Sequence, residues 1–152
     1  MKKPPDLQRL EKMLRASRLA AKGFLGNDPR ALSEIIEQDL SELARLGYTK
    51  EHIATRMQEL TDLGRHGLGT PVTVEEDMAV TVDEHRGQIV CPWPHAGRYA
   101  KTVTLVHRRD TDEQLCWSDL SIHLVGRHGF FQGRGSPFRL DPAQLVRILY
   151  RT

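Results

Sequence analysis

Residues 67–83 read Gly-Leu-Gly-Thr-Pro-Val-Thr-Val-Glu-Glu-Asp-Met-Ala-Val-Thr-Val-Asp, and the spacing of apolar residues changes within this stretch. Its glycines and proline end the helical pattern that precedes them, and β-branched residues follow. From Met78 onward, apolar side chains occupy every second position, which is typical of a half-buried strand. The change predicts an α+β protein, with a helical subregion at residues 1–67 and an α+β subregion at residues 68–152. Because each subregion has few apolar residues of its own, we expect residues 1–152 to form a single compact unit.

Before this boundary, apolar residues recur at helical spacing in three segments. Asp28 and Pro29 predict a cap followed by proline at the first position of the second helix. Thr49 predicts the cap of the third, and Gly47 and Gly64 predict the ends of the second and third. Because the connections are short, we expect helical hairpins. The three helices are expected at residues 5–21, 28–47 and 49–64.

After the boundary, alternating apolar residues predict a small antiparallel sheet of three or four strands. Residues 84–87 are expected to form the turn between the first two strands, and residues 110–112 the turn between the last two. The prolines that follow Cys91 cannot continue a central strand, because each removes a donor from the ladder. The strands are expected at residues 78–83, 88–91, 101–107 and 114–117.

Two helices are predicted at the C-terminal end of the chain. Ser118 and Asp119 are good cap residues for the first, and Gly129 is a natural stop. Asp141 caps the second, and Gln144 stands at its third helical position. We therefore expect N-terminal helical hairpins packed on a small antiparallel sheet, with two C-terminal helices.

Composition and charge exclude several classes of protein. Of the 152 residues, 39% are hydrophobic and 28% are charged, which is ordinary for a folded domain and unlike a disordered chain. The formal net charge of +2 is too small to attract nucleic acid strongly, so specific nucleic-acid binding is not expected. No apolar run approaches the roughly 20 residues that span a bilayer, and the first residues lack the apolar run of a signal peptide. We expect a soluble, cytoplasmic protein with reduced cysteines.

Cysteine and histidine gather in the C-terminal half, and their thiolate and imidazole groups are the usual ligands of zinc. Their spacing matches no familiar zinc finger. Five helical positions rotate by about 140°, so two histidines five apart are expected to converge only if the helix ends before the second. In the alternative interpretation, the cysteines are small buried apolar groups and the histidines are cap or surface residues. The candidate zinc ligands are Cys91, His95, Cys116, His123 and His128.

A catalytic interpretation rests on Asp119 and His123, which stand four residues apart on a predicted helix. At this spacing a carboxylate can orient an imidazole that acts as a base. No nucleophile is evident, although Cys91 or Ser136 could supply one after folding. The alternative is a capping acid beside a surface histidine.

The segment from Gly129 to Pro137 contains three glycines and lies among arginines. Glycines let backbone N–H groups turn toward an anion, and arginine forks bind phosphate or carboxylate. We expect this loop to lie at the surface beside a cleft, because a buried loop would leave backbone groups unpaired. The alternative is a connector whose glycines permit tight turns. The candidate anion-binding residues are His128, Arg134, Ser136 and Arg139.

The second and third expected helices, joined through residues 46–49, have the layout of a helix-turn-helix DNA reader. The reading helix would be residues 50–59, whose two glutamates are unfavourable beside phosphates. An ordinary pair of antiparallel helices explains the same pattern.

The blocks at residues 117–123, 128–131 and 133–139 resemble a sequence shared by bacterial hypothetical proteins to which no function is assigned. The resemblance implies a family and carries no activity. The preferred interpretation is a small binding or regulatory module with an anion- or metal-binding surface in the C-terminal half, whose partner is a small anion or a protein. A small enzyme and a helix-turn-helix-like nucleic-acid binder are the alternatives. No feature of the sequence indicates the oligomeric state.

Overall fold

The computed structural model of the chain describes residues 5–16, 24–95 and 97–150. Within these segments, the helices are α1 (Pro5–Ala16), α2 (Leu32–Arg45), α3 (Lys50–Arg65), α4 (Asp119–His128) and α5 (Pro142–Leu149). The strands are β1 (Val72–Val74), β2 (Met78–Asp83), β3 (Gln88–Val90), β4 (Arg98–Ala100), β5 (Val103–Arg108) and β6 (Glu113–Ser118). The expected α+β class is confirmed. Residues 17–21, the last part of the first expected helix, lie outside the described residues.

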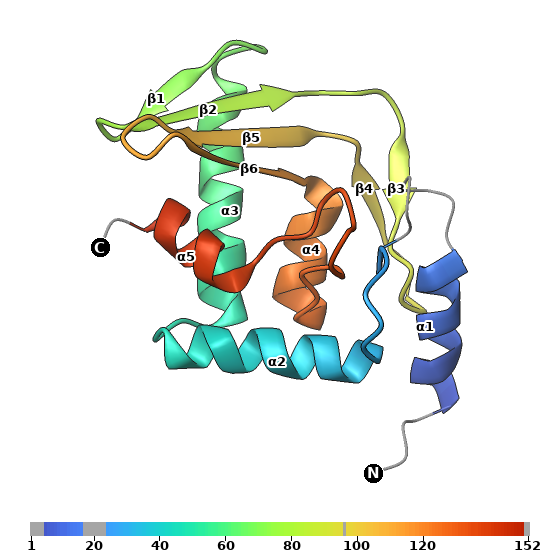
Figure 1. The fold of residues 1–152 in the computed structure, drawn as a ribbon. Coiled ribbons are helices and arrows are strands. Elements are labelled where there is room, and N and C mark those ends of the chain that lie inside the picture. The colour runs from blue at the N-terminus through green and yellow to red at the C-terminus, as the bar shows by residue number, and fades with distance from the viewer. Residues whose placement is uncertain (1–4, 17–23, 96, 151–152) are drawn as a thin grey trace.

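The larger sheet is antiparallel throughout and has the strand order β1-β2-β5-β6. The hairpin expected from the last two strands is confirmed as β5 and β6. Figure 1 shows α3, α4 and α5 on one side of this sheet, with α3 extending from the sheet toward α2. The register aligns Val80 with Val106 and Val106 with Leu115, so these buried side chains form one row beneath the helices.

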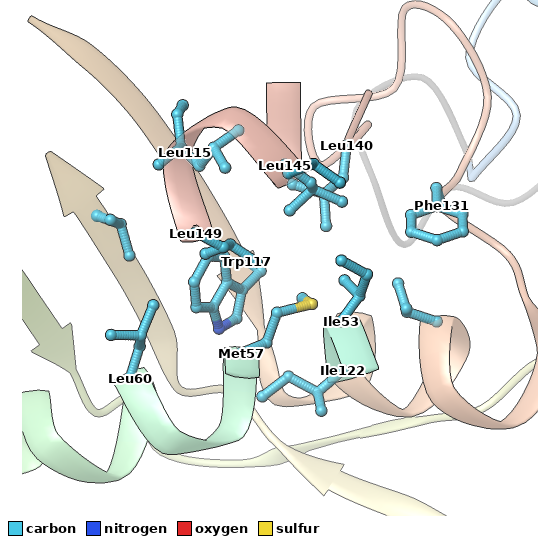
Figure 2. Packing of buried hydrophobic residues seen from close by; sticks show 14 of the residues in the cluster. Ile53, Met57, Leu60, Leu115, Trp117, Ile122, Phe131, Leu140, Leu145 and Leu149 are labelled. Atoms are coloured by element: carbon cyan, nitrogen blue, oxygen red, sulfur yellow. The ribbon is translucent and has the colours of Figure 1, made fainter. Parts of the chain in front are cut away.

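The main core lies between the larger sheet and these helices (Figure 2). Trp117 is fully buried there, and its indole N–H donates to the Thr61 hydroxyl oxygen at 2.9 Å. The Thr61 hydroxyl is also hydrogen-bonded to that of Thr104 at 2.7 Å. These contacts satisfy the polar groups that the core encloses. Residues from both sides of residue 67, such as Met57 and Leu145, pack in this core.

Gly64 does not end α3, contrary to the expectation from the sequence. The helix continues to Arg65, and a Cβ atom at Gly64 would lie 2.6 Å from Val82 Cγ2 and 2.7 Å from Val80 Cγ1. The glycine therefore allows α3 to approach β2 closely, and helix propensity yields to packing at this position.

The hairpin expected between residues 78–83 and 88–91 is wrong. β2 pairs along its whole length with β5, while β3 pairs with β4 in a separate two-stranded ribbon. β5 offers β2 six paired positions, whereas β3 has three residues and is stopped by Pro92. Figure 1 shows the ribbon turned away from the larger sheet toward α1 and α4. A second apolar cluster, which includes Leu14, Cys91 and Leu124, joins these elements.

Three of the expected helix caps are confirmed. The Thr49 hydroxyl oxygen accepts the His52 backbone N–H at 3.1 Å, and Ser118 caps α4 through the N–H of Ser121. The Asp141 carboxylate accepts from the N–H of the glutamine three residues later, which starts α5. Gly129 ends α4 with a φ of 63°, a left-handed conformation that glycine adopts without strain.

The cap expected at Asp28 is wrong. α2 begins at Leu32, whose N–H donates to Glu11 Oε1 of α1 at 2.7 Å. Asp28 is 1% exposed and accepts hydrogen bonds from the Arg30 guanidinium, at 2.6 and 2.9 Å, and from the Arg134 backbone N–H, at 3.1 Å. It joins the segment before α2 to the segment after α4 instead of capping its own helix.

The side-chain hydrogen bonds from Arg30 hold the pKa of Asp28 well below its usual range, against the opposing effect of burial. A carboxylate with a lowered pKa stabilises the fold fully above the pKa of the unfolded chain, and this contribution is lost as the pH falls. Asp28→Asn should therefore cost roughly 2 kcal/mol at pH 7. Below the ordinary aspartate pKa of 3.8 the difference should shrink by about 1 kcal/mol per pH unit. Urea unfolding of both proteins at pH 7 and pH 3 measures this, and a difference that stays constant would contradict it.

No described helix combines the length and the apolar character that a membrane crossing requires.

Candidate metal centre

The segment after β3 folds back over its own cysteine. Pro92 and Pro94 prevent a regular strand, and the Cys91 backbone N–H donates to the Gly97 carbonyl oxygen at 3.2 Å. The backbone N–H of His95 donates to the Trp93 carbonyl oxygen at 2.7 Å. With these contacts, the His95 imidazole and the Cys91 thiol have ligand atoms within 4.8 Å of each other.

α4 supplies two more imidazoles, His123 from its middle and His128 from its end. The expectation that they converge only if the helix ends before His128 is wrong, because His128 is the last residue of α4. Their ring centroids are 5.0 Å apart, and the planes are nearly perpendicular at 84°. The His95 ring lies near both, with centroids at 4.9 Å from His123 and 5.2 Å from His128. The imidazoles of His123 and His128 both lie beside the ring of His95, so they meet although their positions on the helix are far apart in angle.

The ligand atoms of Cys91, His95, His123 and His128 all lie within 4.8 Å of one another. The Nε2 atom of His95 is 3.2 Å from Nε2 of His128 and 3.1 Å from Nε2 of His123, and Cys91 Sγ is 3.6 Å from Nε2 of His128. A zinc tetrahedron with bonds of about 2.05 Å to nitrogen and about 2.3 Å to sulfur has N···N edges of about 3.3 Å and S···N edges of about 3.6 Å. These three distances thus approach the edges of a tetrahedral zinc site.

Aromatic side chains orient two of these imidazoles. The Tyr99 hydroxyl is 2.8 Å from Nδ1 of His123, and the two rings stack with centroids 4.3 Å apart. Trp93 stacks on His128 at 4.2 Å with an interplanar angle of 12° and also contacts Phe130. An imidazole that coordinates through Nε2 carries its proton on Nδ1, so His123 can donate to Tyr99. Such partners fix the orientation of a ligand and raise its basicity.

Three groups of the cluster, Cys91, His123 and His128, have pKa values shifted toward their uncharged forms. Burial, followed by the nearby His123 and His95, lowers the pKa of His128 to about 4, and burial also lowers the pKa of His123. Both imidazoles are therefore uncharged at neutral pH, so each has one ring nitrogen available as a ligand. Burial raises the pKa of the Cys91 thiol, although the backbone N–H of Trp93 opposes this shift by favouring the thiolate. A bound cation would displace the thiol proton.

Cys116, the fifth candidate ligand, does not join this group. It lies on β6, opposite Leu105 of β5, while its neighbours Leu115 and Trp117 face the core. Strand alternation therefore places Cys116 on the face of the sheet away from the helices. The spacing of cysteines and histidines along the sequence could not exclude Cys116 as a ligand. Its exclusion depends on which face of the sheet its side chain occupies.

The proposed pair of Asp119 and His123 is not hydrogen-bonded. Asp119 instead forms an ion pair with Arg65 of α3, at 3.2 Å between Oδ2 and a guanidinium nitrogen. Burial raises the pKa of Asp119, and Oδ1 has no hydrogen-bond partner among the described residues. Tyr99, and not Asp119, is the partner that orients His123. The arrangement gives no support to an acid–base pair.

The glycine-containing loop is less exposed than expected. Residues 130–133 are buried, so their predicted surface position is wrong. A Cβ atom at Gly133 would lie 2.2 Å from the Leu25 carbonyl oxygen, and the Gly133 N–H donates to the Phe24 carbonyl oxygen at 2.9 Å. The glycine permits close contact between two backbones, and pairing with residues 24–28 removes the cost of burying a loop.

The candidate anion-binding residues have mostly intramolecular partners. The Arg139 guanidinium donates to both carboxylate oxygens of Asp39, at 2.5 and 3.0 Å, and to the Gln132 carbonyl oxygen at 2.9 Å. The Ser136 hydroxyl donates to the Gln132 side-chain oxygen, and His128 belongs to the cysteine–histidine cluster. The Arg134 side chain is exposed, while its backbone N–H binds Asp28. Anion binding by these four residues stays a prediction, without support from their arrangement.

α2 and α3 are joined by a short connection, as expected, but α3 packs its apolar face against the larger sheet and α4. Two cations of the candidate reading helix have other partners. Lys50 donates to the Arg127 carbonyl oxygen at 3.3 Å, and Arg56 forms ion pairs with Glu59 and Glu75. The expected absence of specific nucleic-acid binding stays a prediction.

The roles of Tyr99 and Trp93 were not predicted from the sequence. Trp93 stood inside the Cys-Pro-Trp-Pro-His motif, so its proximity to the ligands could have been anticipated. Tyr99 gave no such signal, because its place beside His123 depends on the pairing of β3 with β4. Comparison of the chain with family models, curated proteins and solved structures gave no match.

Proposed function

We propose that this protein is a metal-binding module that holds one Zn²⁺ ion through Cys91, His95, His123 and His128. The observation that supports it is the convergence of these four ligand atoms within 4.8 Å, drawn from two segments of the chain. A fortuitous meeting of surface histidines would not explain why a buried cysteine thiol faces the same point. Of the anion- or metal-binding surface expected in the C-terminal half, the proposal takes the metal-binding alternative.

The donor set favours zinc over calcium and magnesium. Calcium and magnesium prefer carboxylate, carbonyl and water oxygens, and none of the four ligands is an oxygen. One thiolate with three imidazoles in a tetrahedral arrangement is a set that suits zinc. Four protein ligands complete its coordination shell, which is the pattern of structural sites, whereas catalytic sites keep one position for water or substrate. We infer that zinc here joins structural elements and performs no hydrolysis.

The element that zinc would fasten is the ribbon of β3 and β4. The ribbon carries Cys91 and His95 near one end, and α4 carries His123 and His128. Strands of three residues provide few ladder hydrogen bonds, and a two-stranded ribbon is marginally stable alone. Coordination bonds between the ribbon and α4 would give this region the rigidity that a small binding module needs.

The metal content of the purified protein tests the proposal. We expect about one zinc ion per chain by plasma mass spectrometry after loading and desalting, and loss of the ion in Cys91→Ala and His123→Ala. Cys116→Ala and His107→Ala are matched controls, because neither residue belongs to the cluster, and both should retain the metal. With Co²⁺ as the probe, the d–d bands of tetrahedral cobalt and a thiolate charge-transfer band should appear. The latter should vanish in Cys91→Ser.

Zinc that stays bound at full stoichiometry in Cys91→Ala and His123→Ala would contradict the assignment of these ligands. Failure of the parent protein to bind zinc at micromolar concentration would contradict the metal site itself.

A further inference from the structure

A second surface feature lies where the larger sheet meets the ribbon, on residues that the metal centre does not use. A cleft of about 570 Å³ opens there, which we term the basic cleft. Four parts of the chain form it, namely residues 85–89, residues 101–103, the end of β6 and the loop before α5. Its lining residues are His85, Arg86, Ile89, Lys101, Val103, Ser118 and Phe138.

We propose that the basic cleft binds a small organic anion, in which a flat apolar group carries a phosphate or carboxylate. This binding site is separate from the proposed zinc site and does not depend on it. The cleft volume falls within the range of roughly 300–1,000 Å³ that is usual for small-molecule sites.

The charge of the lining supports an anionic ligand. Arg86, Lys101 and His85 are exposed around the cleft, and none of the seven lining residues is acidic. Two other surface cavities of the protein differ in this respect, because one is lined by three glutamates and the other by Asp83 and Glu84. The protein as a whole is nearly neutral, so this local excess of positive charge is a property of the cleft.

Two cations of the cleft, Arg86 and Lys101, stand apart from the other basic residues in their contacts. Among the described residues, neither Arg86 nor Lys101 has an ion pair or a side-chain hydrogen bond. Several arginines of the helices and the larger sheet, by contrast, are paired with carboxylates, as Arg56, Arg65 and Arg108 are. A guanidinium with its five donors unused can bind a phosphate or carboxylate in a bidentate manner, and the lysine adds a point charge.

The apolar residues of the lining indicate that the ligand also carries an apolar group. Ile89, Val103 and Phe138 are half-buried, so their apolar surfaces remain partly open to the cleft. Inorganic phosphate would leave these surfaces in water, whereas an aromatic or aliphatic group would cover them. The ligand should therefore carry both a charge and an apolar body.

Titration of the zinc-loaded protein with phenyl phosphate, followed by amide NMR shifts, tests the proposal. We expect saturable binding, with the largest shifts at residues 85–89, 101–103 and 138. Inorganic phosphate, which lacks the apolar body, and benzyl alcohol, which lacks the charge, should each bind at least about tenfold more weakly, a difference of about 1.4 kcal/mol. Arg86→Gln combined with Lys101→Gln should weaken phenyl phosphate at least tenfold.

Arg98→Gln combined with Arg109→Gln is the matched control, because both arginines are exposed and neither lines the cleft. It removes the same charge and should leave the affinity unchanged. Equal weakening by the control pair, equal affinity for inorganic phosphate, or shifts scattered over the surface would overturn the proposal. The four replaced side chains are exposed, so both variants should melt at the parent temperature, and their zinc content separates this test from that of the metal centre.

Discussion

Removal of zinc by a chelator should lower the melting temperature of this protein by roughly 8–16 °C. A ligand that binds only the folded state stabilises it by about 4 kcal/mol when its free concentration is 1,000 times Kd. For a chain of about 150 residues, each 1 kcal/mol shifts the melting temperature by about 2–4 °C. Differential scanning calorimetry with and without a zinc chelator measures the change, and added zinc should reverse it.

Variants make this expectation specific. Cys116→Ala should show the same shift as the parent, because its thiol lies outside the cluster. His123→Ala should melt near the temperature of the chelated parent and should not respond to the chelator. A chelator effect of equal size in His123→Ala would assign the stabilisation to another site and contradict the prediction.

Hydrogen exchange locates the effect within the fold. Zinc removal should raise the exchange rate mainly in the ribbon of β3 and β4 and in α4 from His123 onward, because these elements carry the ligands. The paired strands β2 and β5 lie in the main core and should remain protected. Uniform loss of protection would show that zinc acts on global stability without a local anchoring role.

Arg139→Ala should lower the free energy of unfolding by about 3–5 kcal/mol, because it leaves a buried carboxylate without its partner. Asp39 is 5% exposed, and Arg139 binds both of its oxygens while also donating to the Gln132 carbonyl oxygen. Urea unfolding measures the loss. The expectation of an anion site predicts the opposite, since it treats Arg139 as available charge on an intact fold.

Arg134→Ala is the matched control for this prediction. Its side chain is exposed on the same loop, so its removal should change the free energy of unfolding by less than about 0.5 kcal/mol. Replacing Asp39 with Asn in the Arg139→Ala background should restore part of the stability, because the unpaired charge disappears. Equal effects of Arg134→Ala and Arg139→Ala, or no rescue by Asp39→Asn, would contradict a structural role for the ion pair.

Helix caps and the β5–β6 hairpin, which depend on residues close together in the sequence, were predicted correctly from it. The caps at Thr49, Ser118 and Asp141 accept hydrogen bonds from N–H groups three residues away. β5 and β6, which the alternation of apolar residues predicted, pair across a short turn. These signals are local, so the sequence contains both partners of each interaction within a few residues. The α+β class follows from them, because it requires only the order and type of the elements.

Partners distant in the sequence were not determined by local signals. Asp28 has the sequence of a helix cap, yet it binds Arg30 and the Arg134 backbone, and α2 is capped by Glu11 of another helix. The same applies to β2, for which a longer ladder with β5 replaces the nearer β3. In each case several partners are chemically acceptable, and tertiary packing selects among them.

The candidate metal site shows the same division. The sequence by itself determined the donor types, since cysteine and histidine gather in one half of the chain, and it named all four residues of the cluster together with Cys116. Only the tertiary structure brought Cys91 and His95 of the ribbon to His123 and His128 of α4, and it placed Cys116 on the far face of a strand. The physical reason is that a tetrahedral site requires ligand atoms at defined distances in space, whereas spacing along a chain fixes distances only within one element.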